Sequence, residues 1–281
     1  MIMRFLFKQL MRKSNMYQSF FGLTQAPLGK ESVVLWGNEQ LTALTQQFTW
    51  LLQSPGVGLL TAEPGLGKTA ALRQVTRSLN PHQYAVTYIA ETDFGRLDFY
   101  RELALVLGVH PAYRRAQLWR NIKAHIVHLA TEKNVLPILI IDEAQNLSFD
   151  FFRDFPAFLN FVFDSRDYMT VWLVGHPELA RDIDRPINRA LASRIQARIE
   201  LKPILDREDF KKLLIHGFTQ AGCTHQLLSD SGTELIRMAS KGNPRQAHQL
   251  IVTALRIACD KKINHLPDDI INDAIAVLKK G

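Results

Sequence analysis

Cysteines are scarce in this sequence, and long apolar runs are missing. Only two cysteines, Cys223 and Cys259, occur among the 281 residues, far apart and without neighbouring metal-ligating residues. This scarcity argues against a disulfide framework or a zinc site and favours a reducing, cytoplasmic setting. The longest apolar runs, such as residues 135–141, fall far short of the roughly 20 residues of a membrane-spanning helix. We therefore expect no membrane association.

The excess of positive charge is small once the first 15 residues are set aside. The sequence carries a formal net charge of +7, from 34 bases and 27 acids. Residues 1–15 hold four bases and no acid, which leaves 30 bases against 27 acids. Bulk charge is therefore a weak indicator of nucleic-acid binding. We interpret residues 1–15 as a basic N-terminal extension, or as the product of a mis-assigned start upstream of Met16.

Short apolar segments alternate with amphipathic ones over the first 200 residues. The apolar segments are almost wholly apolar in their central positions, as expected for parallel strands that are covered on both faces. Strands are expected at residues 56–61, 84–89, 136–142, 170–175 and 197–201. Helices are expected at residues 40–53, 68–79, 98–108 and 116–130. This alternation predicts a doubly wound α/β domain.

Strand patterns stop after residue 201, and only helical patterns follow. Asp206, Ser231 and Asp268 suit N-cap positions, because their side chains can accept hydrogen bonds from the first turn of a helix. Gly222 and Gly242 suit helix ends, where a left-handed residue is common. The helices are expected at residues 207–222, 231–242, 243–262 and 267–280. A small all-α domain is therefore predicted after the α/β domain.

The loop between the first strand and the following helix has the pattern of a phosphate-binding loop. Gly65 and Gly67 allow the loop to curl so that backbone N–H groups converge on a polyphosphate. Lys68 would reach the β- and γ-phosphates, and Thr69 would bind magnesium. Ala62 stands where the strict pattern has its first glycine. The expected nucleotide-binding residues are Ala62, Glu63, Pro64, Gly65, Leu66, Gly67, Lys68, Thr69 and Ala70.

Two adjacent carboxylates follow the apolar segment at residues 136–141. Asp142 would lie at the carboxyl end of a strand, which is where ligands of open α/β sheets bind. An NTPase needs one carboxylate to hold the metal through water and a second to orient the attacking water. We therefore expect Asp142 to hold Mg²⁺ and Glu143 to act as the base.

These segments resemble motifs of AAA+ ATPases. AEPGLGKT and IIDEAQNL resemble the Walker A and Walker B motifs, and VWLVGHPEL resembles the sensor 1 strand. LASRI resembles the element that carries the arginine finger, and GNPRQAHQL resembles the sensor 2 helix. The sequence is most similar to the ExeA-like group, whose members typically start with a stretch like SFFGLTQAPL. The resemblance covers residues 16–275.

The resemblance implies a fold and two cofactors. The fold is a P-loop α/β domain with a mainly parallel five-stranded sheet, the AAA+ core, over residues 16–205. A C-terminal helical lid follows over residues 206–281. The cofactors are ATP and Mg²⁺, and Arg245 of the lid would touch the γ-phosphate.

The resemblance also implies a homo-oligomer, a ring or a filament. Arg194 would reach the nucleotide of a neighbouring subunit, with Arg189 and Arg198 as competing candidates. His176 occupies the sensor 1 position, where AAA+ proteins often have a polar amide. It would either hydrogen-bond the attacking water or the γ-phosphate, or merely cap the exit of the strand.

Our main functional hypothesis is an ATP-dependent regulator of DNA transposition. Such a protein resembles the TnsC, MuB and IstB helper ATPases, which polymerise on duplex DNA and direct a partner transposase, with a possible targeting protein, to its target. A basic cluster supports sequence-tolerant phosphate contacts. The alternative interpretation of this cluster is an ordinary solvated helix face. The cluster consists of Arg114, Arg115, Arg120 and Lys123.

The alternative hypothesis is an ExeA-like ATPase that assists assembly of the secretion machinery. Such proteins are expected to carry a transmembrane helix and an envelope-binding domain, and the sequence shows neither, which favours transposition. A module that has lost hydrolysis is disfavoured, because Lys68, Asp142, Glu143 and Arg245 are all present.

Overall fold

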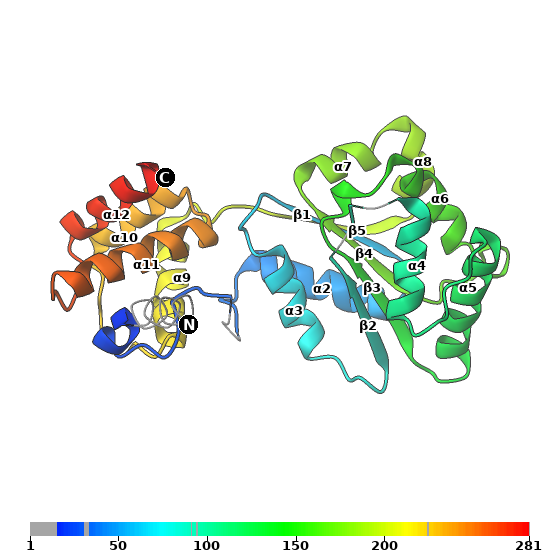
Figure 1. The fold of residues 1–281 in the computed structure, drawn as a ribbon, viewed down its shortest axis with the longest axis horizontal. Coiled ribbons are helices and arrows are strands. Elements are labelled where there is room, and N and C mark those ends of the chain that lie inside the picture. Colours follow the sequence, from blue (N-terminus) through cyan, green and yellow to red (C-terminus); the bar gives the residue numbers. More distant parts are fainter. Residues whose placement is uncertain (1–15, 31–33, 91, 94, 224, 281) are drawn as a thin grey trace, which may run out of the picture. The chain divides into compact units, whose positions relative to one another are not determined.

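A computed structural model gives the fold of the chain (Figure 1). It describes residues 16–30, 34–90, 92–93, 95–223 and 225–280, so the expected basic extension at residues 1–15 lies outside the described residues. The chain divides into two compact units. Of the described residues, those within 16–38, 65–70 and 202–280 form a helical unit, and those within 39–64 and 71–201 form an α/β unit. This division differs from the expected one, since residues 16–38 group with the C-terminal helices.

The α/β unit is built on a parallel sheet of five strands, in the order β2-β3-β4-β1-β5. Every strand pair in this sheet is parallel. The predicted mainly parallel five-stranded sheet is therefore confirmed, and the expected strand bounds hold to within two residues. The strands are β1 (Val57–Ala62), β2 (Tyr84–Ile89), β3 (Leu136–Ile141), β4 (Thr170–Gly175) and β5 (Ile195–Leu201).

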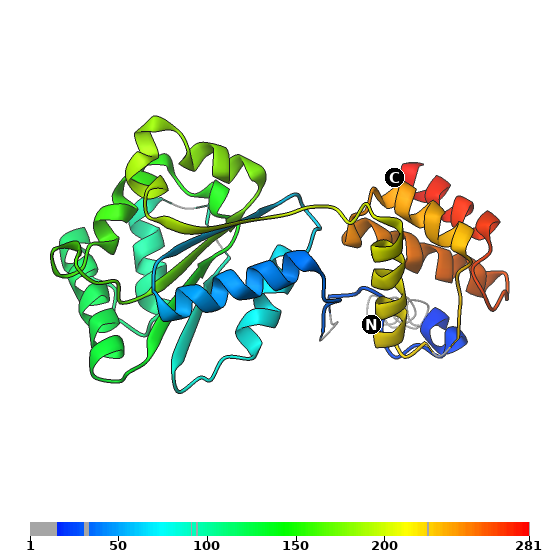
Figure 2. The ribbon, with the colours of Figure 1, turned by 180° about the vertical axis from the view of Figure 1, so that it is seen from behind.

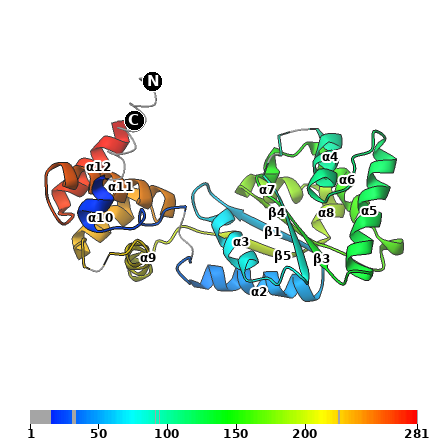
Figure 3. The ribbon, with the colours of Figure 1, turned by 60° about the horizontal axis from the view of Figure 1, so that its bottom comes forward.

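Helices cover both faces of the sheet, because alternate strand residues point to opposite sides. On one face Phe48 of α2 stacks on Trp172 of β4, with ring centroids 5.4 Å apart. Figures 2 and 3 show α2 lying along this face, with α3 beside it. The opposite face is covered by α4, α5 and α6 (Figure 1). These helices are α2 (Glu39–Gln53), α3 (Lys68–Arg77), α4 (Arg96–Val106), α5 (Arg115–Thr131) and α6 (Phe149–Leu159).

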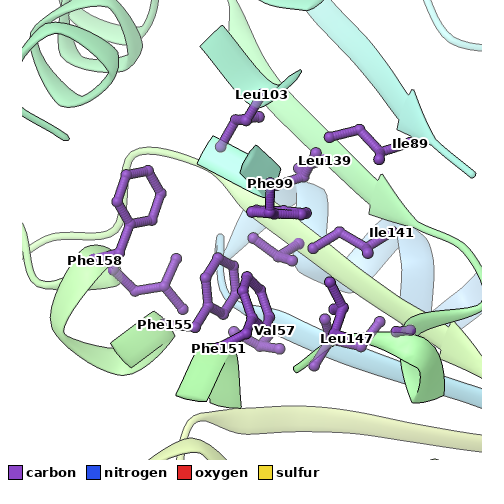
Figure 4. Packing of buried hydrophobic residues seen from close by; sticks show 14 of the residues in the cluster. Val57, Ile89, Phe99, Leu103, Leu139, Ile141, Leu147, Phe151, Phe155 and Phe158 are labelled. Carbon is purple, nitrogen blue, oxygen red and sulfur yellow. The ribbon is translucent and has the colours of Figure 1, made fainter. Parts of the chain in front are cut away.

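Helix α6 supplies much of the aromatic core, although it is not among the helices predicted from the sequence. Its buried residues Phe151, Phe155 and Phe158 recur at helical spacing and pack towards Leu139 and Leu103 in the same cluster (Figure 4). A proline, Pro156, lies inside the helix and obscures the pattern, because proline in a helix interior removes a hydrogen-bond donor. Burial of these rings outweighs that local cost.

Short helices and 3₁₀ turns complete the α/β unit. The segment after β3 forms a 3₁₀ turn, and the segment after β4 begins a helix at Pro177. These two elements matter for the site because each starts where a strand ends. The short elements of the unit are the 3₁₀ turns Ala144–Asn146, Val162–Asp164 and Pro186–Asn188, with helices α7 (Pro177–Ile183) and α8 (Arg189–Ala192).

The helical unit contains the four helices expected after residue 206. The Asp206 side chain accepts a hydrogen bond from the Asp209 N–H, which confirms the predicted N-cap. The predicted cap Ser231 is wrong: α10 begins earlier, and Ser229 accepts from the Gly232 N–H at 2.8 Å. Asp268, also expected as a cap, is the first residue of α12. The helices are α9 (Arg207–Gln220), α10 (Asp230–Ser240), α11 (Pro244–Asp260) and α12 (Asp268–Lys280).

The two expected helix ends are confirmed by their backbone angles. Gly222 follows α9 with a φ of +85°, and Gly242 follows α10 with a φ of +70°. Both values lie in the left-handed region that glycine adopts without steric cost. The chain therefore turns sharply after each helix, as the sequence predicts.

The N-terminal segment at residues 16–28 packs on the helical unit. Tyr17, Phe21 and Leu23 are buried in the core of this unit. The Thr24 N–H donates to the carbonyl of Ala221 at 2.8 Å, and the amide of Gln25 donates to the carbonyl of Gln220. The SFFGLTQAPL stretch is therefore part of the helical unit's structure.

Both cysteines, Cys223 and Cys259, are free thiols. Among the described helices, none is long and apolar enough to cross a bilayer.

A test of the sheet's packing is available at Gly58 of β1. A Cβ at this position would lie 2.6 Å from the indole of Trp172, too close for a real contact. We expect Gly58→Ala to lower the free energy of unfolding by about 1–3 kcal/mol, because overpacking a core forces its neighbours to move. Urea unfolding measures the change, and Gly37→Ala, which meets no atom within 4 Å, is the control. Equal midpoints for the two variants would contradict the packing described here.

Candidate nucleotide site

The predicted phosphate loop connects a buried strand to a helix. All six residues of β1 are buried, and α3 begins at Lys68, directly after the loop. Gly65 and Gly67 have φ values of +87° and +92°, which other residues rarely adopt. Ala62, at the position of the first glycine in the strict pattern, is fully buried as the last residue of β1. The alanine therefore belongs to the strand's packing.

Within the helical unit, the first turn of α11 lies against the loop residue Gly65. The Arg245 N–H donates to the Gly65 carbonyl at 3.3 Å, and it also donates to the Asn243 side chain at 3.0 Å. A Cβ on Gly65 would lie 2.7 Å from Oδ1 of Asn243 and 2.8 Å from Cβ of Arg245. The side chain of Arg245 is exposed, and within the described part of the chain it has no hydrogen-bond or ion-pair partner.

The two predicted carboxylates differ sharply in exposure. Asp142 follows β3 directly and is only 2% exposed, whereas the Glu143 side chain is 42% exposed. Asp142 accepts hydrogen bonds from the Tyr88 hydroxyl at 2.8 Å and from the Glu143 N–H at 2.9 Å. Glu143 has left-handed backbone angles, φ 51° and ψ 36°, and its carbonyl accepts a hydrogen bond from buried Thr92. One carboxylate is thus held in the interior and the other reaches outwards.

A small polar cluster surrounds the Glu143 carboxylate. The side-chain amide of Gln145 donates to Oε2 of Glu143 at 2.7 Å, and Nε2 of His176 lies 3.2 Å from the same oxygen. His176 follows β4 and is the N-cap residue of α7. His176 thus contacts Glu143 and lies at the exit of β4, where its side chain makes no cap hydrogen bond; the expected role towards water or the γ-phosphate stays a prediction.

Tyr88, Thr92 and Gln145 are absent from the residues expected at this site. Gln145 stands three residues after Asp142, inside the segment that resembles Walker B, and that proximity is the one signal available for it. Tyr88 lies in β2, which pairs with β3 so that Ile89 stands opposite Ile141. Nothing in the sequence links Tyr88 to Asp142, because that pairing depends on the order of the strands.

Arg194 is engaged within its own chain. Its two terminal nitrogens donate to both carboxylate oxygens of Asp164, each at 2.9 Å, and one of them also donates to the Asn160 side chain. Hydrogen bonding from Arg194 lowers the pKa of Asp164 below its usual value. Arg198 makes a similar two-pronged pair with Asp184. Arg189 is exposed, and its side chain has no hydrogen-bond or ion-pair partner among the described residues.

The predicted basic cluster is mostly committed to contacts inside the chain. Arg115 pairs with Asp154 at 2.8 Å and lies 4.4 Å from the centre of the Trp119 ring. Lys123 donates to the Asn160 carbonyl, and burial lowers its pKa.

The two remaining members of the cluster lie near the start of α5. Arg120 donates to Gln117 at 2.9 Å. Arg114 is exposed, and it alone among the four has no side-chain partner within the described residues. Only part of the cluster therefore presents free charge.

The donor set near the sheet edge suits magnesium. No group of three or more His, Cys, Asp or Glu residues lies together among the described residues. Zinc and calcium sites typically need such groups, whereas Mg²⁺ is usually bound by one or two carboxylates, waters and substrate phosphates. Within the α/β unit, Asp142 fits this requirement.

The geometry of Gly67 gives a test of the loop. No atom lies within 4 Å of a Cβ at this position, so Gly67→Ala acts through its φ of +92° alone. We expect the variant to weaken ATP binding about tenfold, because holding a non-glycine residue in the left-handed region costs about 1–2 kcal/mol. Titration with a fluorescent ATP analogue measures the change, and Gly37→Ala is the control. Unchanged affinity would show that the loop does not depend on this angle.

Comparison with known proteins finds a family match, largely within the α/β unit, and one sequence relative. The model of the AAA domain family matches residues 51–182. General secretion pathway protein A of Aeromonas hydrophila is 26% identical over 254 residues, which cover 88% of this chain and 44% of that protein. The chain thus spans less than half the length of this curated relative.

Solved structures resemble the chain in fold at low sequence identity. Cdc6p from Pyrobaculum aerophilum has a TM-score of 0.68 and 17% identity, over 92% of this chain and 70% of that one. The ORC1 protein of Aeropyrum pernix, solved in complex with DNA, has a TM-score of 0.65 and 15% identity, over 89% and 68%. The RuvB Holliday junction branch migration motor of Thermotoga maritima has a TM-score of 0.59 and 17% identity, over 86% and 70%. The α/β unit therefore has the P-loop AAA+ fold, and residues 51–182 match the AAA domain family.

Proposed function

We propose that the protein is a Mg²⁺-dependent ATPase of the ExeA-like kind whose turnover is coupled to self-assembly. The match to the AAA domain and the similarity to general secretion pathway protein A support an AAA+ ATPase. The observation that carries the proposal is the pair of carboxylates at the end of β3, one buried and one exposed. In a chain that also has a phosphate loop, this pair provides the two functions that nucleotide hydrolysis requires.

The residues of the chain divide the work of hydrolysis. The loop at residues 62–70 binds the phosphates through its backbone N–H groups, and Lys68 neutralises the β- and γ-phosphates. Asp142 and Thr69 would hold Mg²⁺, which would supply positive charge to neutralise the phosphates. Glu143 accepts a proton from the attacking water. Its oxygen Oε1 has no hydrogen-bond partner among the described residues, so it is open to a water molecule.

Arginine residues complete the proposed mechanism. Arg245 at the start of α11 senses the γ-phosphate, which its free guanidinium and the contact of its backbone with Gly65 support. Arg194 acts on the nucleotide of a neighbouring subunit, so that assembly and hydrolysis are linked. In this conformation Arg194 is hydrogen-bonded to Asp164 of its own chain. Action on a neighbouring subunit therefore requires these two hydrogen bonds to break. Arg189 needs no such release.

The similarity to general secretion pathway protein A favours a role in assembling secretion machinery over a role in transposition. One reason that favoured transposition was the cluster at residues 114–123. Three of the four basic side chains in that cluster are committed elsewhere.

A transposition role remains the second candidate, because one solved neighbour in the AAA+ fold is in complex with DNA. In that case duplex DNA and a transposase would be the partners of an oligomer. If the secretion proposal holds, the chain shows no tight, length-dependent binding to duplex DNA with ATP, measured by fluorescence anisotropy. Binding that weakens steeply with salt would favour transposition. A loss of that binding in Arg114→Ala with Arg115→Ala, at unchanged ATP affinity, would locate the contact.

Replacement of the proposed base tests hydrolysis directly. Glu143→Gln removes the proton acceptor and keeps the side chain's size, so turnover should fall at least about a hundredfold while ATP binding persists. Phosphate release measures turnover, and a fluorescent ATP analogue measures binding. Lys68→Ala, which should lose binding as well, is the contrasting variant. A Glu143→Gln protein with the parent's rate would exclude Glu143 as the base.

Self-assembly can be tested on the same variant. Glu143→Gln should trap the ATP-bound state, so ATP should shift the protein to a larger size in chromatography with light scattering. An unchanged size with ATP, in the presence and absence of DNA, would contradict the proposed coupling.

A further inference from the structure

We propose that Gln145 is a positioning residue that aims Glu143 and ties it to the end of β4. The inference rests on the proposed ATPase function and deepens it. Its basis is a set of contacts around one side-chain amide, all of them within the α/β unit.

Both ends of the Gln145 amide are in use. Its Nε2 donates to Oε2 of Glu143 at 2.7 Å, and its Oε1 accepts a hydrogen bond from the backbone N–H of His176 at 3.1 Å. A side chain bonded at both ends has one geometry that satisfies both contacts. The amide therefore fixes the distance between the Glu143 carboxylate and the junction of β4 with α7.

The backbone of Glu143 is fixed separately. Its N–H donates to Asp142 at 2.9 Å, its carbonyl accepts from the Thr92 hydroxyl at 2.8 Å, and its φ is 51°. With the main chain held, the direction of the carboxylate depends on the groups that contact its oxygens. Gln145 and His176 both contact Oε2. They thus hold one oxygen and leave Oε1 to face a water molecule.

Gly175 makes room for this arrangement. A Cβ on Gly175 would overlap Oε1 of Gln145 and would lie 2.9 Å from Cδ2 of Leu179. The glycine is required by space, since its φ is not in the left-handed region. Gly175 also pairs with Thr61 of β1, and Thr61 lies one residue before the end of that strand.

These contacts form a continuous path through the sheet. Glu143 contacts Gln145, Gln145 contacts the end of β4, and the end of β4 pairs with the end of β1, which leads into the phosphate loop. A displacement of the β1 end therefore moves the partner that orients the base. The path connects the orientation of the base to the end of the strand that precedes the phosphate loop.

A merely structural role for Gln145 is the competing explanation. In that role its Oε1 would simply accept the N–H of His176 at the start of α7, and Glu143 would be a bystander. Gln145→Glu separates the two explanations. The new side chain keeps an acceptor for the His176 N–H, but it loses the donor to Glu143 and places a second carboxylate against it.

The experiment measures kcat, KM and ATP affinity for Gln145→Met, Gln145→Glu and Gly175→Ala. Gln145→Met keeps the length of the side chain without its hydrogen bonds. We expect kcat to fall about ten- to a hundredfold in each variant, while ATP affinity changes less than about threefold, because hydrogen bonds to charged groups orient the base and do not bind the nucleotide. The matched control is Gln46→Met, an exposed glutamine on α2. A Gln145→Glu protein with the parent's kcat would overturn the proposal.

A double-variant cycle guards against general destabilisation. In the Glu143→Gln background, Gln145→Met should cause little further loss of turnover, because the residue that it positions has already been disabled. An additive loss would show that Gln145 acts independently of Glu143 and would overturn the inference. If Glu143→Gln alone leaves turnover unchanged, the proposed function fails first. If Glu143→Gln lowers turnover and Gln145→Met does not, the inference alone fails.

Discussion

The common direction of the five strands is the constraint on which the site depends. Since all strand pairs are parallel, the carboxyl ends of β1, β3 and β4 lie at one edge of the sheet. The segments that leave this edge are the phosphate loop, the carboxylate pair and the His176 junction. Burial of apolar strand residues on both faces holds that edge in place, so packing that is remote from the candidate site fixes the positions of its residues in the α/β unit.

Sequence patterns predicted the sheet, the carboxylate pair after β3 and the loop glycines with positive φ, because those features are local. Strand periodicity, glycines that need positive φ, and a charge directly after an apolar run can all be read within ten residues. The contacts of Tyr88 and Gln145 could not be predicted in this way. They depend on strand order and on a left-handed residue at Glu143, and neither has a sequence signal. Helix α6 was missed because Pro156 obscures its apolar spacing.

The charge of a side chain was a poorer guide to binding residues than its position after a strand. Arg114, Arg115, Arg120 and Lys123 form a conspicuous basic group, yet the fold gives three of them partners inside the chain. A basic side chain next to aromatic residues can equally cover a core, because its aliphatic stem packs on the rings. Lys123 beside Phe161 is such a case, with its nitrogen 4.9 Å from the ring centre.

The turn at Val162–Asp164 has a consequence for how Arg194 is understood. Three successive residues other than glycine have φ values of 44°, 56° and 60°, and each conformation of this kind costs on the order of 1–3 kcal/mol. The Arg194 side chain donates hydrogen bonds to Asp164 in this turn and to Asn160 just before it. Truncating Arg194 would therefore remove hydrogen bonds that hold the strained turn, and it would also remove a guanidinium charge. A substitution of Arg194 would therefore change two things at once. Any loss of activity would combine the missing positive charge with the altered conformation of the turn.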